Sequence, residues 1–165
     1  MEIKKRLAEL GFELPPLPQP RGAYVPGIQV GEFIWTSGQL PFVAGELRYR
    51  GKLGVNLSVA EGYEAAKLCV LNCLSVVEHI AGTLDAVEQI VRLVGFVASG
   101  EGFTEQAQVL NGASELLFAL FGEKGRHARC AVGVQELPLG APVEIELLVR
   151  VRCYNNLGSE EHFHT

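Results

Sequence analysis

The sequence predicts an α+β fold in which two main helices cover one face of a mixed β-sheet. Three observations lead to this prediction. A capping box opens a long amphipathic segment at residues 58–81. Apolar and polar residues alternate strictly over residues 143–153. The segments run in the order strand, strand, helix, strand, helix, strand, strand, and none is a repeat of another. A chain of 165 residues has the length of one domain.

The N-terminal region is predicted to add a short helix and an extended arm. Ile3, Leu7 and Leu10 recur at helical spacing with charged residues between them, and Gly11 ends the pattern. The segment LPPLPQP at 14–20 is too rich in proline to form a helix. We therefore expect residues 1–19 to form a helix and an arm on the body of the domain.

The central region supplies the first strands and the longest helix. The β-branched and aromatic residues of 28–40 predict a strand that ends at Pro41, and the glycines of 45–54 predict a hairpin or meander. Ser58 and Glu61 form the capping box of a helix over 59–81, which Gly82 ends. Cys69 and Cys73 fall on this helix as buried core thiols.

The second half is predicted to contain a strand, a helix and then two final strands. Residues 88–99 predict a strand, 103–121 predict a helix that Gly122 ends, and 129–135 and 143–153 predict two more strands. The polar residues 155–165 predict a frayed tail. The domain thus spans 20–154, between the arm and the tail.

Composition excludes several classes of protein. Fourteen basic and nineteen acidic side chains give a net charge of −5, which argues against a large nucleic-acid interface. No run reaches the ~18–20 apolar residues of a membrane helix, and the charged N-terminus is not a signal peptide. Four cysteines without a CxxC pair suit reduced thiols and a cytoplasmic location. Without ligand spacing or a glycine-rich phosphate loop, we expect no metal and no cofactor.

Strand alternation indicates which side chains share a face. In the last strand Val143 and Ile145 begin the apolar face, and Glu144 begins the polar one. In the strand before it, the apolar set Cys130, Val132 and Val134 is expected to face the helices. Arg129 would then join Glu144 on the helix-free face, together with Ala131 and Gly133. The pattern leaves two interpretations open: a solvated face with surface ion pairs, or a self-assembly face with a carboxylate-binding cleft at the arginine.

Three segments in this order resemble one family. GAYVPGI (22–28), IWTSGQLP (34–41) and RHARCAVGVQELPLGAPVEIELLV (126–149) are similar to the Rid family of reactive-intermediate (enamine/imine) deaminases, also called the YjgF-like or L-PSP endoribonuclease family. The resemblance covers about residues 20–152, and the extended N-terminus resembles a longer branch. It implies a chorismate-mutase-like α+β fold and a homotrimer with active sites in clefts between subunits.

The resemblance also implies roles for residues at matching positions. Arg129 would bind the carboxylate of the substrate, and Glu144 would hold the attacking water. Ser37 and Gly38 would line the side of the site that holds the water, and Tyr24 and Phe96 would form the walls of the pocket. The main chain at Ala131 would contact the imine nitrogen.

Two positions depart from the family pattern, and a third position, which matches it, is interpreted as structural. Ala131 stands where many members have cysteine, and His127 stands where proline is usual. Both departures bear on substrate choice. Asn72 matches a position that is often polar in the family and is interpreted as structural.

The function implied by the resemblance is hydrolysis of a 2-imino acid to a 2-keto acid and ammonia. An arginine fork fixes the carboxylate, and one water held by a carboxylate attacks the C=N carbon, so no metal or nucleotide is required. One alternative is a non-catalytic or regulatory protein that binds a small keto acid. A second is ribonuclease activity, which the net charge of −5 and the lack of a paired-histidine motif disfavour.

Overall fold

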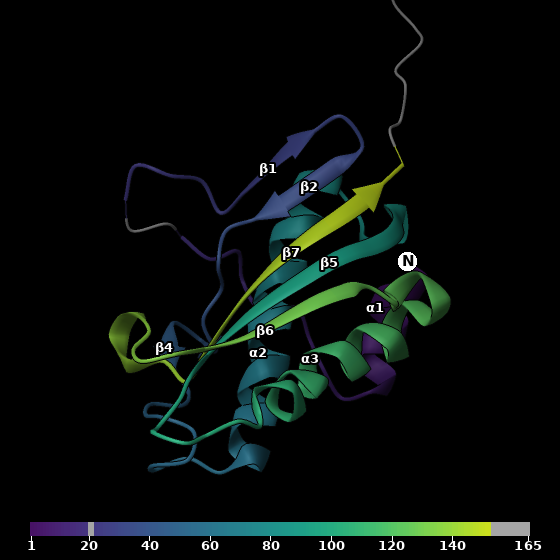
Figure 1. The fold of residues 1–165 in the computed structure, drawn as a ribbon. Helices are drawn as coiled ribbons and strands as arrows, with labels where there is room; N and C mark the ends of the chain where they lie inside the picture. Colours follow the sequence, from purple (N-terminus) through teal and green to yellow (C-terminus); the bar gives the residue numbers. More distant parts are fainter. Residues whose placement is uncertain (20–21, 153–165) are drawn as a thin grey trace, which may run out of the picture.

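The computed structural model describes residues 1–19 and 22–152, and it confirms the α+β class (Figure 1). A five-stranded sheet in the order β1-β2-β7-β5-β6 lies in front of α2 and α3, and a two-stranded ribbon β3-β4 lies at one end. The helices and strands are α1 Glu2–Glu9, β1 Gly27–Val30, β2 Phe33–Thr36, β3 Phe42–Val43, β4 Glu46–Leu47, α2 Val59–Ala81, β5 Val87–Ala98, α3 Gln106–Phe121, β6 Ala128–Val134 and β7 Val143–Val151. Residues 153–154 of the predicted domain and the tail 155–165 lie outside the described residues.

The segment 28–40 is not the single strand that its composition predicts. It begins as a hairpin in which β1 pairs antiparallel with β2, and Val30 lies opposite Phe33. Gly31 and Glu32 form the two-residue turn, and the φ of Gly31 is +58°. A glycine at the first central position is the signature of a type II′ hairpin turn, which apolar composition alone does not reveal. The chain therefore reverses within the predicted strand.

Helix α2 forms as predicted and fills the centre of the molecule. The Ser58 hydroxyl accepts from the backbone N–H of Glu61, and the Glu61 carboxylate accepts from the backbone N–H of Ser58. Cys69 and Cys73 are fully buried and donate to backbone carbonyls of β7. Burial raises the pKa of Cys73 to about 12 and that of Cys69 well above its usual range. Both are core thiols, as predicted.

Strand β7 lies at the centre of the sheet and confirms the predicted alternation. Val143 and Ile145 are fully buried beneath the helices, whereas Glu144 is half-buried on the opposite side. We call this opposite side, which neither α2 nor α3 covers, the open face. Antiparallel pairing with β5 places Glu144 opposite Phe96, so Phe96 also belongs to the open face.

The face predicted for the 129–135 strand is wrong. Strand β6 pairs parallel with β5, and Arg129 lies beside Leu93, whose side chain is fully buried under the helices. Arg129, Ala131 and Gly133 therefore face the helix side, and the apolar Cys130, Val132 and Val134 face the open side. The error has a physical cause. β6 is an edge strand, and the helix it meets, α3, offers it polar groups as well as apolar ones.

The N-terminal segment packs on the outside of the helical layer. Ile3 and Leu7 of α1 are buried in the main core, and Phe12 and Leu14 pack against it. The following prolines run across α2 toward β1 (Figure 1). Within the described ranges no helix is long and apolar enough to cross a membrane.

Candidate active site

The open face carries two carboxylates in the middle of an apolar surface. Glu144 and Glu146 project from β7 on the same side, and both are partly buried. Burial raises the pKa of Glu144, and the nearby charge of Glu146 raises it further. A carboxylate with a raised pKa holds its proton more readily and is a stronger base toward water than an exposed one.

The loop after β2 is fixed against Glu144. The backbone N–H of Ser37 donates to the Pro26 carbonyl over 2.8 Å, and its hydroxyl donates to the Val25 carbonyl over 2.6 Å. Gln39 and Ile145 exchange two backbone hydrogen bonds of 2.8 and 3.0 Å, which tie the loop to β7. These bonds leave the Ser37 hydroxyl oriented toward the main chain.

Gly38 allows the Glu144 carboxylate to lie where it does. A Cβ atom at Gly38 would overlap Oε1 of Glu144 and lie 2.9 Å from its Cδ, closer than real Cβ contacts allow. The absence of a Cβ at Gly38 thus permits this close approach, and the φ of the residue is not positive. Any side chain here would displace the carboxylate.

A cavity of about 580 Å³ adjoins this loop. Tyr24 and Gly38 line it, and they come from segments on either side of the β1–β2 hairpin. Phe96 does not line the cavity; it lies beside Glu144 on the open face. The structure thus brings together Tyr24, Ser37, Gly38, Phe96 and Glu144 around one end of the sheet.

Arg129 lies apart from this group, on the opposite side of the sheet. Its Nη1 donates to Asn111 Oδ1 over 2.9 Å and to Ser114 Oγ over 3.1 Å, and its Nη2 donates to the Ala107 carbonyl over 3.3 Å. All three acceptors belong to α3. Of the five guanidinium N–H groups, Nε–H and the second Nη2–H meet no acceptor among residues 1–19 and 22–152. This pair forms one edge of the guanidinium fork, the geometry that binds a carboxylate at two points.

A histidine supports the arginine through Ser114. His127 Nδ1 lies 2.6 Å from the Gly125 carbonyl, which can only accept, so Nδ1 carries the proton. Nε2 then accepts from the Ser114 hydroxyl over 2.9 Å, and the same hydroxyl oxygen accepts from Arg129. Burial lowers the pKa of His127, and the charge of Arg129 lowers it further. The hydrogen bond to the Gly125 carbonyl raises it, but the net shift is downward. A neutral His127 keeps this chain of donors and acceptors in order.

These supporting residues were not found by sequence reasoning. The signal was present in α3, where Asn111 and Ser114 stand three residues apart and so share one side of the helix. Ala131 lies two residues along from Arg129 and on the same face, at the exposed edge of the sheet. An edge strand presents unpaired backbone groups, which suits a main-chain contact to a ligand.

Asn72 has the structural place that was predicted. Its amide nitrogen donates to the carbonyls of Leu40, Phe42 and Leu68 over 3.0–3.1 Å, and its side chain is buried. It therefore fixes the segment between β2 and β3 to helix α2.

Comparison with known proteins decides the family. A family model described as "YjgF/chorismate_mutase-like, putative endoribonuclease" matches residues 4–150. The chain belongs to this YjgF family. A RutC family protein of Aquifex aeolicus is 31% identical over 137 residues, covering 83% of this chain and 95% of that protein. Protein TCP17 of Trypanosoma cruzi is 45% identical over 152 residues, covering 90% of this chain and 94% of that protein.

Two solved structures of other proteins share the fold. Protein Atu1372 of Agrobacterium tumefaciens, described as of unknown function, superposes with a TM-score of 0.86 at 42% identity and covers 91% of this chain and 92% of that one. A "putative endoribonuclease" of Shewanella oneidensis superposes with a TM-score of 0.89 at 36% identity and covers 92% of this chain and 100% of that one. The resemblance inferred from the three sequence segments is confirmed at the level of family and fold.

Proposed function

We propose that this YjgF-family protein hydrolyses 2-imino acids to 2-keto acids and ammonia in clefts between the subunits of a homotrimer. The observation that carries the proposal is the separation of two complementary half-sites. Arg129 offers a free guanidinium edge at β6, and Glu144 lies on the open face of β7. Within one chain the sheet stands between them, so two chains are needed to bring them together.

The open face supports an assembly of this kind. Five apolar side chains on it are 37–65% exposed: Ile28, Val30, Phe33, Trp35 and Val132. An exposed apolar surface of this extent is typical of a protein–protein interface. Because Val132 and Arg129 lie on one edge strand, covering the open face of one subunit with the edge of another would carry Arg129 to the neighbour's Glu144.

In the proposed reaction the carboxylate of the substrate binds the free edge of Arg129. This two-point contact fixes the C=N carbon relative to the neighbouring subunit. Glu144 accepts a proton from a water molecule as that water attacks the carbon, and the imine nitrogen takes up a proton as the C=N double bond becomes single, which gives a carbinolamine. Glu144 returns its proton to the amine, the new hydroxyl loses its proton to solvent, and the C–N bond breaks to leave the 2-keto acid and ammonia. The main chain at Ala131 contacts the imine nitrogen, and Tyr24, Ser37, Gly38 and Phe96 surround the substrate. The reaction requires no metal or cofactor, and it suits a cytoplasmic protein with reduced thiols.

The test is to generate 2-aminoacrylate or 2-iminopropionate in situ with a dehydratase or an amino-acid oxidase and to follow keto-acid formation. Micromolar protein should accelerate it. Glu144→Gln should slow hydrolysis yet retain binding of the keto acid, because its shape is kept and its basicity is lost, whereas the exposed Glu101→Gln should change neither. Thermal stabilisation by keto acids without any turnover would favour the non-catalytic binding function instead.

Ribonuclease activity is the second candidate, because the family description and the Shewanella relative carry the endoribonuclease name. The net charge of −5 weighs against an extended RNA contact. RNA cleavage that scales with protein and is lost in Arg129→Ala would reverse the ranking.

A further inference from the structure

The cavity beside Gly38 has a wall that the proposed reaction does not use. Residues Pro15–Gln19 of the N-terminal arm form one side of it, and the β3–β4 ribbon with the 3-10 turn η3, Pro138–Gly140, forms another. The arm thus reaches from α1, on the far side of the helical layer, to the neighbourhood of the candidate active site (Figure 1).

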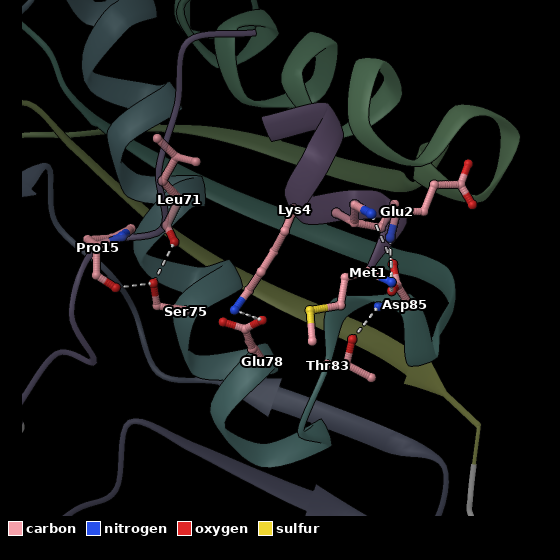
Figure 2. A network of polar contacts seen from close by, with 10 residues as sticks. Met1, Glu2, Lys4, Pro15, Leu71, Ser75, Glu78, Thr83 and Asp85 are labelled. Atoms are coloured by element: carbon pink, nitrogen blue, oxygen red, sulfur yellow. Dashed lines mark hydrogen bonds and ion pairs between the residues drawn. The ribbon is translucent and has the colours of Figure 1, made fainter. Parts of the chain in front are cut away.

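The arm is fixed where it begins, and the helix before it is fixed too (Figure 2). The Ser75 hydroxyl of α2 donates to the Pro15 carbonyl over 2.6 Å. In α1, the terminal amine of Met1 pairs with Asp85 at 2.6 Å, and Lys4 pairs with Glu78 at 2.9 Å. Proline-rich chain is stiff and extended. The arm therefore leaves its anchor at Pro15 as a stiff segment along the cavity.

Two tight turns beside the cavity hold a non-glycine residue in the left-handed region of φ. Among residues 1–19 and 22–152, two non-glycine residues have a left-handed φ: Ala44 at 51° and Leu139 at 60°. Both line this cavity. Strained backbone of this kind persists where the surrounding structure holds it and gathers at ligand-binding sites.

The lining suits an apolar group. Prolines and Leu17 come from the arm, and Leu40 and Phe42 come from the segment after β2. The amide of Asn72, which also lines the cavity, is already used by three backbone carbonyls, and the Gln39 amide donates to the Ser37 carbonyl. The cavity therefore offers apolar contact and few free donors.

The size of the cavity also points to a larger substrate. A volume of about 580 Å³ falls within the ~300–1,000 Å³ of ordinary small-molecule pockets, which is more space than a three-carbon imino acid needs. Tyr24 and Gly38 line the cavity, and Gly38 also contacts the Glu144 carboxylate. The cavity and the candidate reaction centre are thus neighbours across one glycine.

We propose that this cavity is the side-chain pocket of the enzyme and that the arm makes it selective for 2-imino acids with a bulky apolar side chain. The proposal rests on the proposed deaminase function and adds its substrate preference. Each methylene placed in an apolar pocket contributes about 10–200-fold in kcat/KM. We expect the imine derived from leucine to be hydrolysed at least about tenfold more efficiently than the imine derived from alanine.

The experiment compares the two imines, each generated by an amino-acid oxidase, in the full chain and in two variants. Leu17→Trp fills the cavity from the arm, and its leucine-to-alanine preference in kcat/KM should fall by at least about tenfold. Leu10→Trp is the control, since Leu10 is 45% exposed at the end of α1 and does not line the cavity. It should keep the wild-type preference. Equal efficiency toward both imines in the wild type, or an unchanged preference in Leu17→Trp, would overturn the proposal.

A binding measurement separates this proposal from the deaminase function. Thermal-shift titration with 4-methyl-2-oxopentanoate and with pyruvate needs no turnover. The branched keto acid should bind at least about tenfold more tightly to the wild type and to Leu10→Trp, and this advantage should be lost in Leu17→Trp. If no imine is hydrolysed but this binding pattern is observed, the deaminase function is rejected and the preference of the cavity for bulky apolar side chains is retained. If the alanine imine is hydrolysed but the branched keto acid binds no more tightly than pyruvate, the deaminase function is retained and the preference of the cavity for bulky apolar side chains is rejected.

Discussion

Strands β7 and β6 belong to one sheet, but the same alternation pattern has opposite meanings in them. In β7 the apolar residues face α2 and are fully buried, and the carboxylates face the open side. In β6 the apolar residues face the open side, and Val132 is 37% exposed there. The polar Arg129 of β6 turns instead toward α3.

The difference comes from position in the sheet. The apolar face of β7, at the centre of the sheet, is buried against the helices of its own chain. An edge strand has a second option, because its apolar face can be covered by another chain. The helix side of β6 is then free to hold a charged group, which α3 positions through Asn111 and Ser114. The comparison is the basis for the proposal that another subunit covers this edge.

The largest expected effect comes from making the open face polar. Trp35→Asp places a charge on a residue that is 51% exposed in the single chain. We expect loss of assembly and of nearly all activity, because burying an unpaired carboxylate is costly. Sedimentation should show monomers. Val43→Asp is the control, since Val43 is 43% exposed on the separate β3–β4 ribbon, and it should keep the assembly. A fully active Trp35→Asp monomer would break the comparison.

The next effect concerns the arginine fork on β6. Arg129→Lys keeps the charge but loses the two-point contact, so kcat/KM should fall about 10–150-fold, the equivalent of one charged hydrogen bond of about 1.5–3 kcal/mol. Thermal stability should change much less. Arg126→Lys, an exposed arginine three residues earlier, is the control and should behave as wild type. Lowered stability with intact specific activity would make Arg129 a structural residue.

A smaller effect tests the β7 side. Gly38→Ala would push the Glu144 carboxylate from its place, and we expect kcat to fall about tenfold, since small displacements of a reacting group are costly. The loss should act through the carboxylate. In the Glu144→Gln variant, adding Gly38→Ala should therefore lower kcat little further. A double-mutant cycle measures this non-additivity. Full additivity would mean that Gly38 acts in another way.

The smallest effect is a shift in pH dependence. Burial and the charge of Glu146 raise the pKa of Glu144, so the ionised base that the reaction needs is lost as pH falls through this raised pKa. Glu146→Gln removes the second cause, lowers the pKa of Glu144, and should move the acid limb of kcat to lower pH. Glu101→Gln should leave the limb in place. A limb that moves upward in Glu146→Gln would contradict the role of Glu144 as the base.

Much of the fold could be predicted because local signals and burial agree. The capping box at Ser58, the glycine after α2 and the alternation of β7 each specify structure within a few residues. The hairpin at Gly31 was missed because the residues on both sides of it are equally β-forming. Only the turn glycine distinguishes one strand from two.

The family could be predicted from the three segments that carry the resemblance, whereas the functional roles of the site residues stay predictions. The structure places Glu144 beside Gly38. The place of Arg129 could not be predicted, because the face of an edge strand depends on what covers it. The arm was expected on the body of the domain, but its position at the cavity depends on the Ser75 hydrogen bond far along the sequence.

The most direct test of the central claim mixes two inactive variants. Co-expression of differently tagged Arg129→Ala and Glu144→Gln chains, followed by purification through both tags, isolates mixed assemblies. In a cyclic trimer every mixed assembly has one site of three with an intact arginine from one chain and an intact glutamate from its neighbour, so about a third of wild-type activity should return. If both residues acted within one chain, no site would be intact. Mixed trimers as inactive as either parent would contradict the account.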